Sequence, residues 1–430
     1  MGEEPTVAVA VSVVVAHYRQ QPQLDRLLAA LEVADPVQGG FEVVVADDGS
    51  PVPPQVGRRC YPVRVVGQPH DGFRLAATRN RGAASARGRL LCFLDADTVP
   101  GPAYLSAMAD AAGVEQDPGG GVTVLVGRRR HVDLSGWGAD RVVAWLRDPG
   151  RPGPPILTDP VWLQDGYRDT ADLSAGDDTA FRYVIGAVLG VPRVVWQATG
   201  GFDESFRHYG GEDWELAQRC WLAGADLRHL PHAVAWHDGP DLTGREDELV
   251  MTKNVETAHL ARRLTHPLVR GTGLRYAVPD IVVEADVTGW SLGQIVLCAE
   301  ALLRGSDVGL WLTGLDGPAR DALAEDPRVH GGAPPSEVLR RCRHRVRLRG
   351  PVVLPGGTLA DVVDDDSPAG LVELTSTRAL GRAALHRTPL PAPRGPRPDR
   401  VRPIPADTLV ERWRQPGWGG GGGDRSDGPG

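Results

Sequence analysis

Alternating strand-like and helix-like patterns organise the first 110 residues. Four segments are rich in β-branched and apolar residues, as strands buried on both faces are: Val7–Ala16, Phe41–Ala46, Tyr61–Gly67 and Gly88–Asp97. Helical spacing of apolar positions predicts a helix after the first, third and fourth of these strands: Leu24–Ala34, Leu75–Ala86 and Pro102–Ala112. This alternation predicts an α/β fold with a mostly parallel sheet covered by helices.

The pattern is less regular between residues 113 and 178, where one strand is predicted over Val122–Val132. Three further elements are then predicted: a helix over Asp213–Gly224, a short strand over Val234–Gly239, and a helix from Leu249 to about Arg263. A second strand–helix–strand unit follows over Ile281–Val287, Ser291–Gly305 and Val308–Gly314, and Val362–Leu385 extends it. From residue 387 the chain is rich in Pro, Arg and Gly, which predicts a disordered tail.

Composition and charge narrow the class of protein. With 41% hydrophobic and 24% charged residues, the 430-residue chain resembles an average soluble globular protein. Its 47 basic and 55 acidic residues give a net charge of −8, which argues against a nucleic-acid-coating protein. No stretch reaches 18 apolar residues, so the sequence predicts no transmembrane segment and at most transient contact with a membrane surface.

The five cysteines are widely spaced, which excludes a zinc ribbon and a dense disulfide framework. Scattered thiols fit a reducing cytosol. We therefore expect a cytoplasmic protein, or one peripheral to the inner face of the membrane.

Three groups of residues are candidates for chemistry, each with a simpler alternative. Asp95 and Asp97 end a hydrophobic strand and could hold one hard cation, or they form a polar strand end before a turn. Glu212 and Asp213 follow two glycines at a helix start, where a carboxylate can accept a hydroxyl proton or simply favour the helix dipole. His237 ends the short strand and suits Mn²⁺, although a lone histidine is more often an ordinary surface or core residue.

Taken in order, the motifs are more specific than any one of them. They read VSVVVAHYR, VVADDGS, GFRLAATRNRGAASARGRLLCFLDADTVP, GGFDESFRHYGGEDWELAQRCWLAG and AWHD. Over residues 7–245 this order resembles family 2-type glycosyltransferases of the GT-A fold. Residues 200–224 also resemble the carboxyl-terminal motif of animal galactosyl- and N-acetylgalactosaminyltransferases. The chain departs from the pattern at Ala16 and Arg19, where proline and asparagine are usual, and at Trp214, where a small or apolar residue is usual.

The resemblance implies a donor site for a nucleoside-diphosphate sugar. Its implied nucleotide-sugar-binding residues are Ala16, His17 and Tyr18 at the end of the first strand, Asp47 and Asp48 after the second, then Arg74, Arg79, Asn80 and Asp95. An arginine among these could pair with diphosphate or could stabilise its own helix. For Asp48, simple turn chemistry is the alternative.

The resemblance also implies a metal site and a catalytic acid pair. Asp97 and His237 match the metal-ligand positions, with Mn²⁺ or Mg²⁺ as the cofactor. Glu212 matches the acceptor-binding acid and Asp213 the general base. An aspartate at position 213 favours inversion, because retaining enzymes of the animal type carry asparagine there. Aromatic residues between Trp137 and Tyr167 are equally candidates for acceptor stacking and for core packing.

These implications predict an inverting, metal-dependent glycosyltransferase. The expected partners are a nucleoside-diphosphate sugar, with uridine favoured by family frequency, and a glycan, lipid-linked or small-molecule acceptor. The alternative is an inactive sugar-nucleotide-binding partner of a larger polysaccharide synthase. A nucleotidyltransferase is disfavoured, because AHYRQQPQ after the first strand is not a Gly-rich, Lys-bearing loop.

The predicted division is a GT-A catalytic domain (1–265), a linker (266–280), an accessory α/β domain (281–386) and the tail (387–430). The accessory domain reads as a degenerate GT-A-like companion. Asp364, Asp365 and Asp366 form a solvated loop in this interpretation, and a second active site in the alternative of a bifunctional polymerase.

Overall fold

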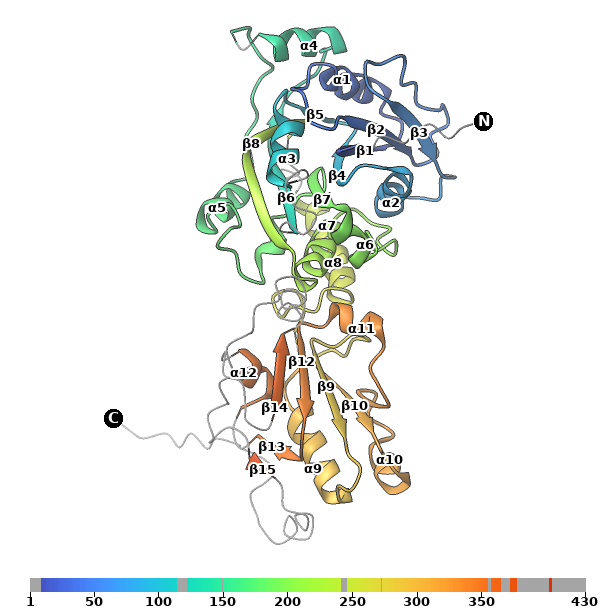
Figure 1. Ribbon diagram of the computed structural model, residues 1–430, viewed down its shortest axis with the longest axis vertical. Helices are drawn as coiled ribbons and strands as arrows, with labels where there is room; N and C mark the ends of the chain where they lie inside the picture. The colour runs from blue at the N-terminus through green and yellow to red at the C-terminus, as the bar shows by residue number, and fades with distance from the viewer. Residues whose placement is uncertain are drawn as a thin grey trace, which may run out of the picture. The chain divides into compact units, whose positions relative to one another are not determined.

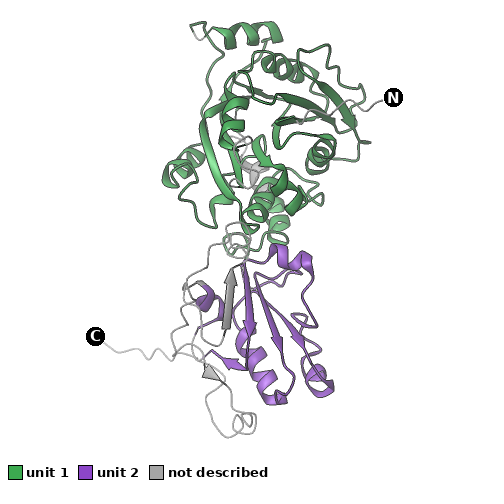
Figure 2. Ribbon diagram, in the orientation of Figure 1, with its two compact units in different colours: residues 1–270, 378–387 green, residues 271–377, 388–430 purple. Residues whose placement is uncertain are grey.

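The computed structural model describes residues 9–113, 122–148, 150–240, 246–271, 273–354, 357–364, 372–376 and 402–403. Apart from residues 402–403, the tail predicted over 387–430 lies outside these ranges, as do Asp365 and Asp366. The chain divides into two compact units (Figure 2). Unit 1 comprises residues 1–270 and 378–387, and unit 2 comprises residues 271–377 and 388–430.

Unit 1 is built on an eight-stranded sheet in the order β3-β2-β1-β4-β7-β6-β8-β5 (Figure 1). Its strands are β1 (Val11–His17), β2 (Phe41–Asp47), β3 (Val63–Gly67), β4 (Leu90–Asp95), β5 (Thr98–Pro100), β6 (Thr123–Val132), β7 (Val188–Pro192) and β8 (Asp226–Asp238). The predicted α/β class is confirmed. The short strand predicted over 234–239 is in fact the end of β8, which has 13 residues.

The four strands β3, β2, β1 and β4 are parallel, so their carboxyl ends meet at one edge of the sheet. Every residue of β1 is buried, as its unbroken apolar pattern predicts. The register pairs His17 with Asp47 and Ala16 with Asp95. Four residues expected at the donor site are therefore set beside one another in two pairs, His17 with Asp47 and Ala16 with Asp95.

The other strands extend this sheet. β7 runs antiparallel to both β4 and β6, β8 is parallel to β6, and β5 is antiparallel to β8. The last pairing sets Thr98 opposite His237, which brings the turn after β4 to the end of β8.

Unit 1 contains eight α-helices in its described residues: α1 (Gln21–Leu31), α2 (Leu75–Ser85), α3 (Tyr104–Ala111), α4 (Ala139–Arg147), α5 (Val161–Asp169), α6 (Arg193–Thr199), α7 (Glu212–Leu222) and α8 (Glu246–Ala261). The predicted helical spacing holds in α1, which buries Leu24, Leu27, Leu28 and Leu31. The irregular stretch 113–178 contains two helices, α4 and α5, that its mixed polar composition did not reveal.

A buried polar cluster joins the starts of β1, β2 and β4. The Glu42 side chain is fully buried and accepts hydrogen bonds from Ser12 Oγ (2.7 Å), the Arg87 amide (2.7 Å) and Arg64 Nη1 (2.8 Å). Ser12 Oγ in turn accepts from the Gly88 amide at 2.7 Å. A Cβ on Gly88 would lie 2.3 Å from the Ser12 backbone nitrogen, so only glycine fits there.

Unit 2 has a smaller sheet in the order β11-β10-β9-β12-β14. Its strands are β9 (Ile281–Asp286), β10 (Val308–Thr313), β11 (Val329–Gly331), β12 (His344–Leu348) and β14 (Val372–Ser376). The helices are α9 (Leu292–Leu303), α10 (Gly317–Leu323), α11 (Ser336–Arg341) and α12 (Leu359–Asp364), and β13 (Val352–Val353) pairs with β15 (Arg402–Pro403). A capping box between Ser291 and Gln294 starts α9.

The two sheets share a strand order. In each, four parallel strands in the order 3-2-1-4 are followed by an antiparallel fifth: β7 beside β4, and β14 beside β12. When the first residues of β1 and β9 are matched and the register is extended one residue beyond β10 and β12, Gly314 falls at the position of Asp47 and Arg349 at that of Asp95. Unit 2 therefore repeats the sheet order of unit 1 without those carboxylates. Asp364 ends α12 and does not follow a strand.

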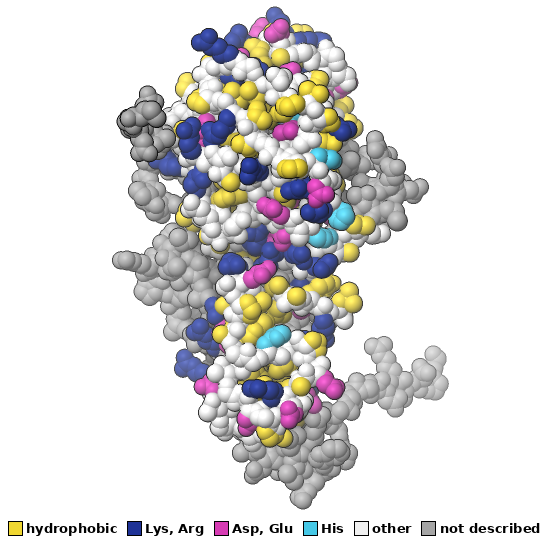
Figure 3. Space-filling view, turned by 90° about the vertical axis from the view of Figure 1, so that its right-hand side faces the viewer, with side chains coloured by type: hydrophobic (Ala, Val, Ile, Leu, Met, Phe, Trp, Pro, Cys, Tyr) yellow, Lys and Arg dark blue, Asp and Glu magenta, His cyan; other side chains and the backbone are white. Residues whose placement is uncertain are grey.

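The surface and the thiols agree with the composition. Acidic and basic side chains are interspersed with apolar ones on the face shown in Figure 3. All five cysteines are free, and four of them are buried. Among the helices in the described ranges, none is both long and apolar enough to cross a bilayer.

Candidate active site

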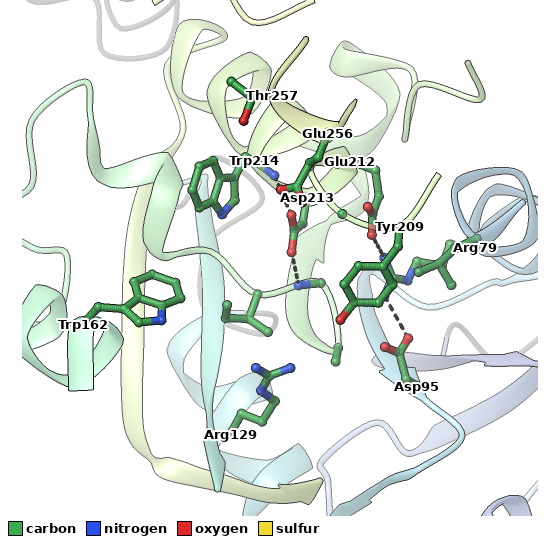
Figure 4. A pocket seen from close by; sticks show the side chains of 16 residues that line it. Arg79, Asp95, Arg129, Trp162, Tyr209, Glu212, Asp213, Trp214, Glu256 and Thr257 are labelled. Atoms are coloured by element: carbon green, nitrogen blue, oxygen red, sulfur yellow. Dashed lines mark hydrogen bonds and ion pairs between the residues drawn. The ribbon is translucent and has the colours of Figure 1, made fainter. Parts of the chain in front are cut away.

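Unit 1 contains a pocket of about 420 Å³ (Figure 4). Helices α2, α5, α7 and α8 and strands β4 and β6 all contribute to its wall. The charged and aromatic lining residues are Arg79, Asp95, Arg129, Trp162, Tyr209, Glu212, Asp213, Trp214 and Glu256. The pocket thus gathers Arg79, Asp95, Glu212 and Asp213, four of the residues that the sequence singled out.

Two glycines with left-handed backbones bring the acid pair into the pocket. Gly210 and Gly211 have φ angles of 91° and 89°, which side-chain-bearing residues rarely adopt. A Cβ on Gly211 would lie 2.0 Å from the Leu260 side chain, so the glycine is also needed for packing. Helix α7 starts directly afterwards and carries Glu212 and Asp213 in its first turn.

Each acid of the pair is held by a specific donor. The Gly186 amide donates to Asp213 Oδ2 at 2.9 Å, and Arg79 Nη1 donates to Glu212 Oε1 at 2.8 Å. Glu212 Oε2 is buried and has no hydrogen-bond partner among the described residues. The second oxygen of Glu212 is therefore left with its hydrogen-bonding capacity unused.

The environment disfavours the ionised forms of both acids. Burial and the neighbouring Asp213 raise the pKa of Glu212 to about 7, against the opposing charge of Arg79. Burial also raises the pKa of Asp213, although the hydrogen bond from Gly186 and the charge of Arg79 oppose the rise. A carboxylate whose pKa lies nearer neutrality is a better proton acceptor, so the pair suits general-base chemistry.

Hydrogen bonds fix the side chains of the residues that are predicted to bind the nucleoside. His17 Nδ1 lies 2.8 Å from Asp47 Oδ1, and Ser50 Oγ donates to the same oxygen at 2.6 Å. Burial raises the pKa of Asp47, but the hydrogen bonds from Ser50 and His17 outweigh this and leave the pKa below its usual range. Asp48 accepts from Gln68 Nε2 at 2.7 Å. Asp47 is therefore a fixed carboxylate at neutral pH.

Three other residues expected at the donor site have protein partners. The Tyr18 ring stacks on His70 with a centroid separation of 4.5 Å. Arg74 immediately precedes α2 and donates to Gln68 at 3.2 Å. Asn80 exchanges two hydrogen bonds of 2.9 Å with the backbone of Phe202, so its amide holds the loop before α7. Contact of these side chains with a nucleotide stays a prediction.

The two predicted metal ligands face each other. His237 Nδ1 lies 3.3 Å from Asp97 Oδ1, and this buried nitrogen has no well-aligned hydrogen bond to any described residue. Burial raises the pKa of Asp97, but His237 and Gln20 outweigh it and keep the pKa below its usual range. Within the described ranges, no third His, Cys, Asp or Glu completes a group of three around them. An oxygen and a nitrogen donor fit Mn²⁺, with further positions left for diphosphate oxygens and water.

Most of the named aromatic residues of the insert pack in the interior, and one lines the pocket. Trp137 and Trp145 pack with Trp236 in a small core cluster. Tyr167 is buried and stacks on His229 at 3.6 Å. Trp162 alone of the insert lines the pocket, and its side chain is 45% exposed.

Sequence reasoning missed Arg129, Tyr209 and Glu256, which also line the pocket. Tyr209 directly precedes the two glycines, and that position was the available signal for it. Arg129 in β6 and Glu256 in α8 come from segments without a recognisable motif.

Comparison with known protein families places this site in context. Residues 12–160 match the sequence model of glycosyl transferase family 2, and residues 176–237 match the model described as the N-terminal domain of galactosyltransferase. The first part of the chain is therefore similar to family 2 glycosyltransferases. The segment that carries Glu212 and Asp213 is similar to the galactosyltransferase model.

Individual relatives are similar over part of their length. The chain is 25% identical over 244 residues to chondroitin synthase of Escherichia coli, covering 53% of this chain and 34% of that protein. It is 31% identical over 242 residues to validoxylamine A glucosyltransferase of Streptomyces hygroscopicus subsp. limoneus, covering 50% of this chain and 49% of that protein. It is 28% identical over 336 residues to pre-mycofactocin glycosyltransferase of Mycobacterium tuberculosis, covering 71% and 63%. The chain thus spans between about a third and just under two thirds of the length of these relatives.

Two solved structures resemble this chain, with low TM-scores. The mannosyltransferase PcManGT of Pyrobaculum calidifontis, in complex with GDP-Man and Mn²⁺, has a TM-score of 0.41 and 16% identity over 62% of this chain and 68% of its own. Residues 1–349 of TarS from S. aureus have a TM-score of 0.38 and 16% identity over 58% and 65%.

Proposed function

We propose that this chain is an inverting, metal-dependent glycosyltransferase. It moves a sugar from a nucleoside-diphosphate sugar, with UDP the first candidate, to a hydroxyl of a glycan, lipid-linked or small-molecule acceptor. The observation that carries the proposal is the position of Asp213, a carboxylate anchored by a backbone amide in a pocket that also holds Arg79, Asp95 and Glu212. The family 2 match supports the same class of reaction.

In this mechanism Asp213 accepts the proton of the acceptor hydroxyl while that oxygen attacks the anomeric carbon from the face opposite the nucleotide. Glu212 accepts a hydrogen bond from the acceptor through its free oxygen, Oε2. Asp47 and Asp48 bind the nucleoside, and Asp95 faces the ribose. Asp97 and His237 would hold a divalent metal, which would supply positive charge to balance the diphosphate leaving group.

A binding-only partner of a larger synthase is the second candidate. The similarity to chondroitin synthase of Escherichia coli motivates it. The two candidates differ in turnover, and the same assay separates them.

The test is release of nucleoside diphosphate from a panel of nucleotide sugars with Mn²⁺, Mg²⁺ or excess EDTA. We expect turnover with metal, and loss of it in EDTA. Asp213→Asn should lower turnover about 10²–10⁴-fold without changing donor affinity. Asp97→Asn should instead weaken metal-dependent UDP binding. Asp140→Asn is the matched control, because Asp140 is also an acid in a first helical turn but does not line the pocket.

Two outcomes would contradict the proposal. Near-wild-type turnover of Asp213→Asn would remove the proposed base. UDP binding without turnover on any donor and acceptor, by a chain with both acids intact, would favour the binding-only partner.

A further inference from the structure

Arg79 is one of the largest fully buried side chains of the protein, with 2% exposure. Its two terminal nitrogens bind different carboxylates on different elements. Nη2 donates to Asp95 at the end of β4 and Nη1 donates to Glu212 at the start of α7, both at 2.8 Å. One guanidinium therefore spans the donor-side acid and the acid pair, as Figure 4 shows.

The space around Arg79 is shaped for this bridge. A Cβ on Gly186 would lie 2.7 Å from Arg79 Nη1, so the glycine leaves room for the guanidinium. The same glycine donates its amide to Asp213. The ring of Phe202 lies 5.2 Å from the guanidinium carbon, a cation–π distance. Arg79 and Asp213 are thus positioned by one short segment of backbone.

The pocket around Glu212 carries more acidic than basic side chains, so Glu212 needs the charge of Arg79 to stay ionised. Four carboxylates line the pocket, from Asp95, Glu212, Asp213 and Glu256, and the cationic lining residues are Arg79 and Arg129. Tyr209 adds a phenol whose pKa burial raises to about 12, so it is neutral. Like charges in a buried site favour proton uptake, and a directly bonded arginine opposes it.

We propose that Arg79 is a positioning residue that opposes protonation of Glu212 and Asp213 and fixes Glu212 relative to Asp95, and that it does not serve as a diphosphate ligand. This inference rests on the proposed function, because it takes Asp213 as the base. With Arg79 in place, the pKa of Glu212 rises no further than about 7, so a large fraction of the pair can accept a proton or a hydrogen bond at neutral pH. Without it, the acid pair holds a proton and the base is blocked until the pH is raised.

The test compares Arg79→Met, which removes the charge, with Arg79→Lys, which keeps a charge but loses the two-pronged geometry. The assay is donor hydrolysis with Mn²⁺, using whichever of UDP-glucose, UDP-N-acetylglucosamine and GDP-mannose the wild type hydrolyses fastest. In the plot of kcat against pH, we expect the acidic limb to shift to higher pH, by about 1–2 pH units in Arg79→Met and by less in Arg79→Lys. The rate should fall about 10-fold or more at pH 6.5 and recover at pH 8.5.

Arg219→Lys is the matched control. Arg219 is also buried and bonded to a glutamate, Glu215 of α7, but it does not line the pocket. We expect this variant to lose thermal stability and to keep the wild-type acid limb. An Arg79→Met profile lowered equally at every pH would overturn the proposal, and so would an unmoved limb. If Arg79→Met does not fold, the shift of the acidic limb in Arg79→Lys is the test, with the same outcomes.

A second readout does not need turnover. Titration of ¹³C-labelled glutamate carboxyls by NMR, with Glu212 assigned through Glu212→Gln, should show its pKa rising in the Arg79 variants. An unchanged Glu212 pKa would contradict the role of Arg79. Absence of donor hydrolysis in the wild type would contradict the proposed function, while this titration would still decide the role of Arg79.

Discussion

Glu42 offers a stability test whose size follows from its contacts. It is fully buried, and Ser12, Arg64 and the backbone and side chain of Arg87 donate to its two oxygens. Burial raises its pKa, but these donors outweigh burial and lower the pKa from 4.5 to about 2. In Glu42→Gln one oxygen becomes an amide nitrogen that faces arginine donors, so the charge and part of the hydrogen bonding are lost.

The magnitude comes from the pKa shift. A fall from 4.5 to about 2 corresponds to about 3 kcal/mol of stability. Because Arg87 is half-exposed, solvent screening reduces this, and we expect Glu42→Gln to cost about 2–3 kcal/mol at pH 7. The folded pKa lies below the unfolded value, so this stability is present above pH 4.5 and is lost as the pH falls toward 2.

The assay is urea unfolding followed by tryptophan fluorescence at pH 7 and at pH 3.5. The difference between wild type and Glu42→Gln should be clearly smaller at pH 3.5. Glu32→Gln is the control, because Glu32 pairs with Arg59 at 3.3 Å near the surface, where we expect less than about 1 kcal/mol. An equal loss at both pH values, or a loss no larger than in the control, would refute the reasoning.

Two further predictions address the fold and the acceptor. Gly88→Ala should lower the free energy of unfolding by about 2 kcal/mol or more, because the new Cβ would lie 2.3 Å from the Ser12 backbone. Gly138→Ala, where the space is open, should lower it by less than about 1 kcal/mol. Equal melting temperatures of the two variants would contradict this. Trp162→Ala should raise the acceptor KM about 10-fold and leave donor hydrolysis unchanged, because its half-exposed ring lines the pocket; a lower kcat for hydrolysis would point to a structural role instead.

Much of unit 1 could be predicted from its sequence for a physical reason. Strands buried on both faces must be apolar throughout, so β1, β2 and β4 stand out. The acids of β2 and β4 fall at carboxyl ends, and the parallel register then sets Asp47 beside His17 and Asp95 beside Ala16. The contact between Asp97 and His237 was predictable only through the motif order, since the two residues are far apart in the chain.

What the sequence did not reveal depends on side-chain partners and on strands without a strong pattern. The partners of Arg79 could not be read from its motif, because arginine binds diphosphate and carboxylate equally well. β7 is short, and α4 and α5 lie in a stretch rich in Gly, Pro and Asp, where the apolar period is weak. Trp137 and Trp162 are in one insert, yet packing buries the first and leaves the second in the pocket wall.

The place of β8 in the sheet has a consequence for folding kinetics. β8 pairs with β6 and with β5, and its end brings His237 to Asp97. Pairing of β8 with β5 closes a loop that runs from the end of β5 at Pro100 to the start of β8 at Asp226. Closing so long a loop costs entropy before the pairing is formed, which favours late docking of β8. A ligand that bridges Asp97 and His237 would then bind the completed sheet and not its precursors. It should slow unfolding while leaving the refolding rate nearly unchanged.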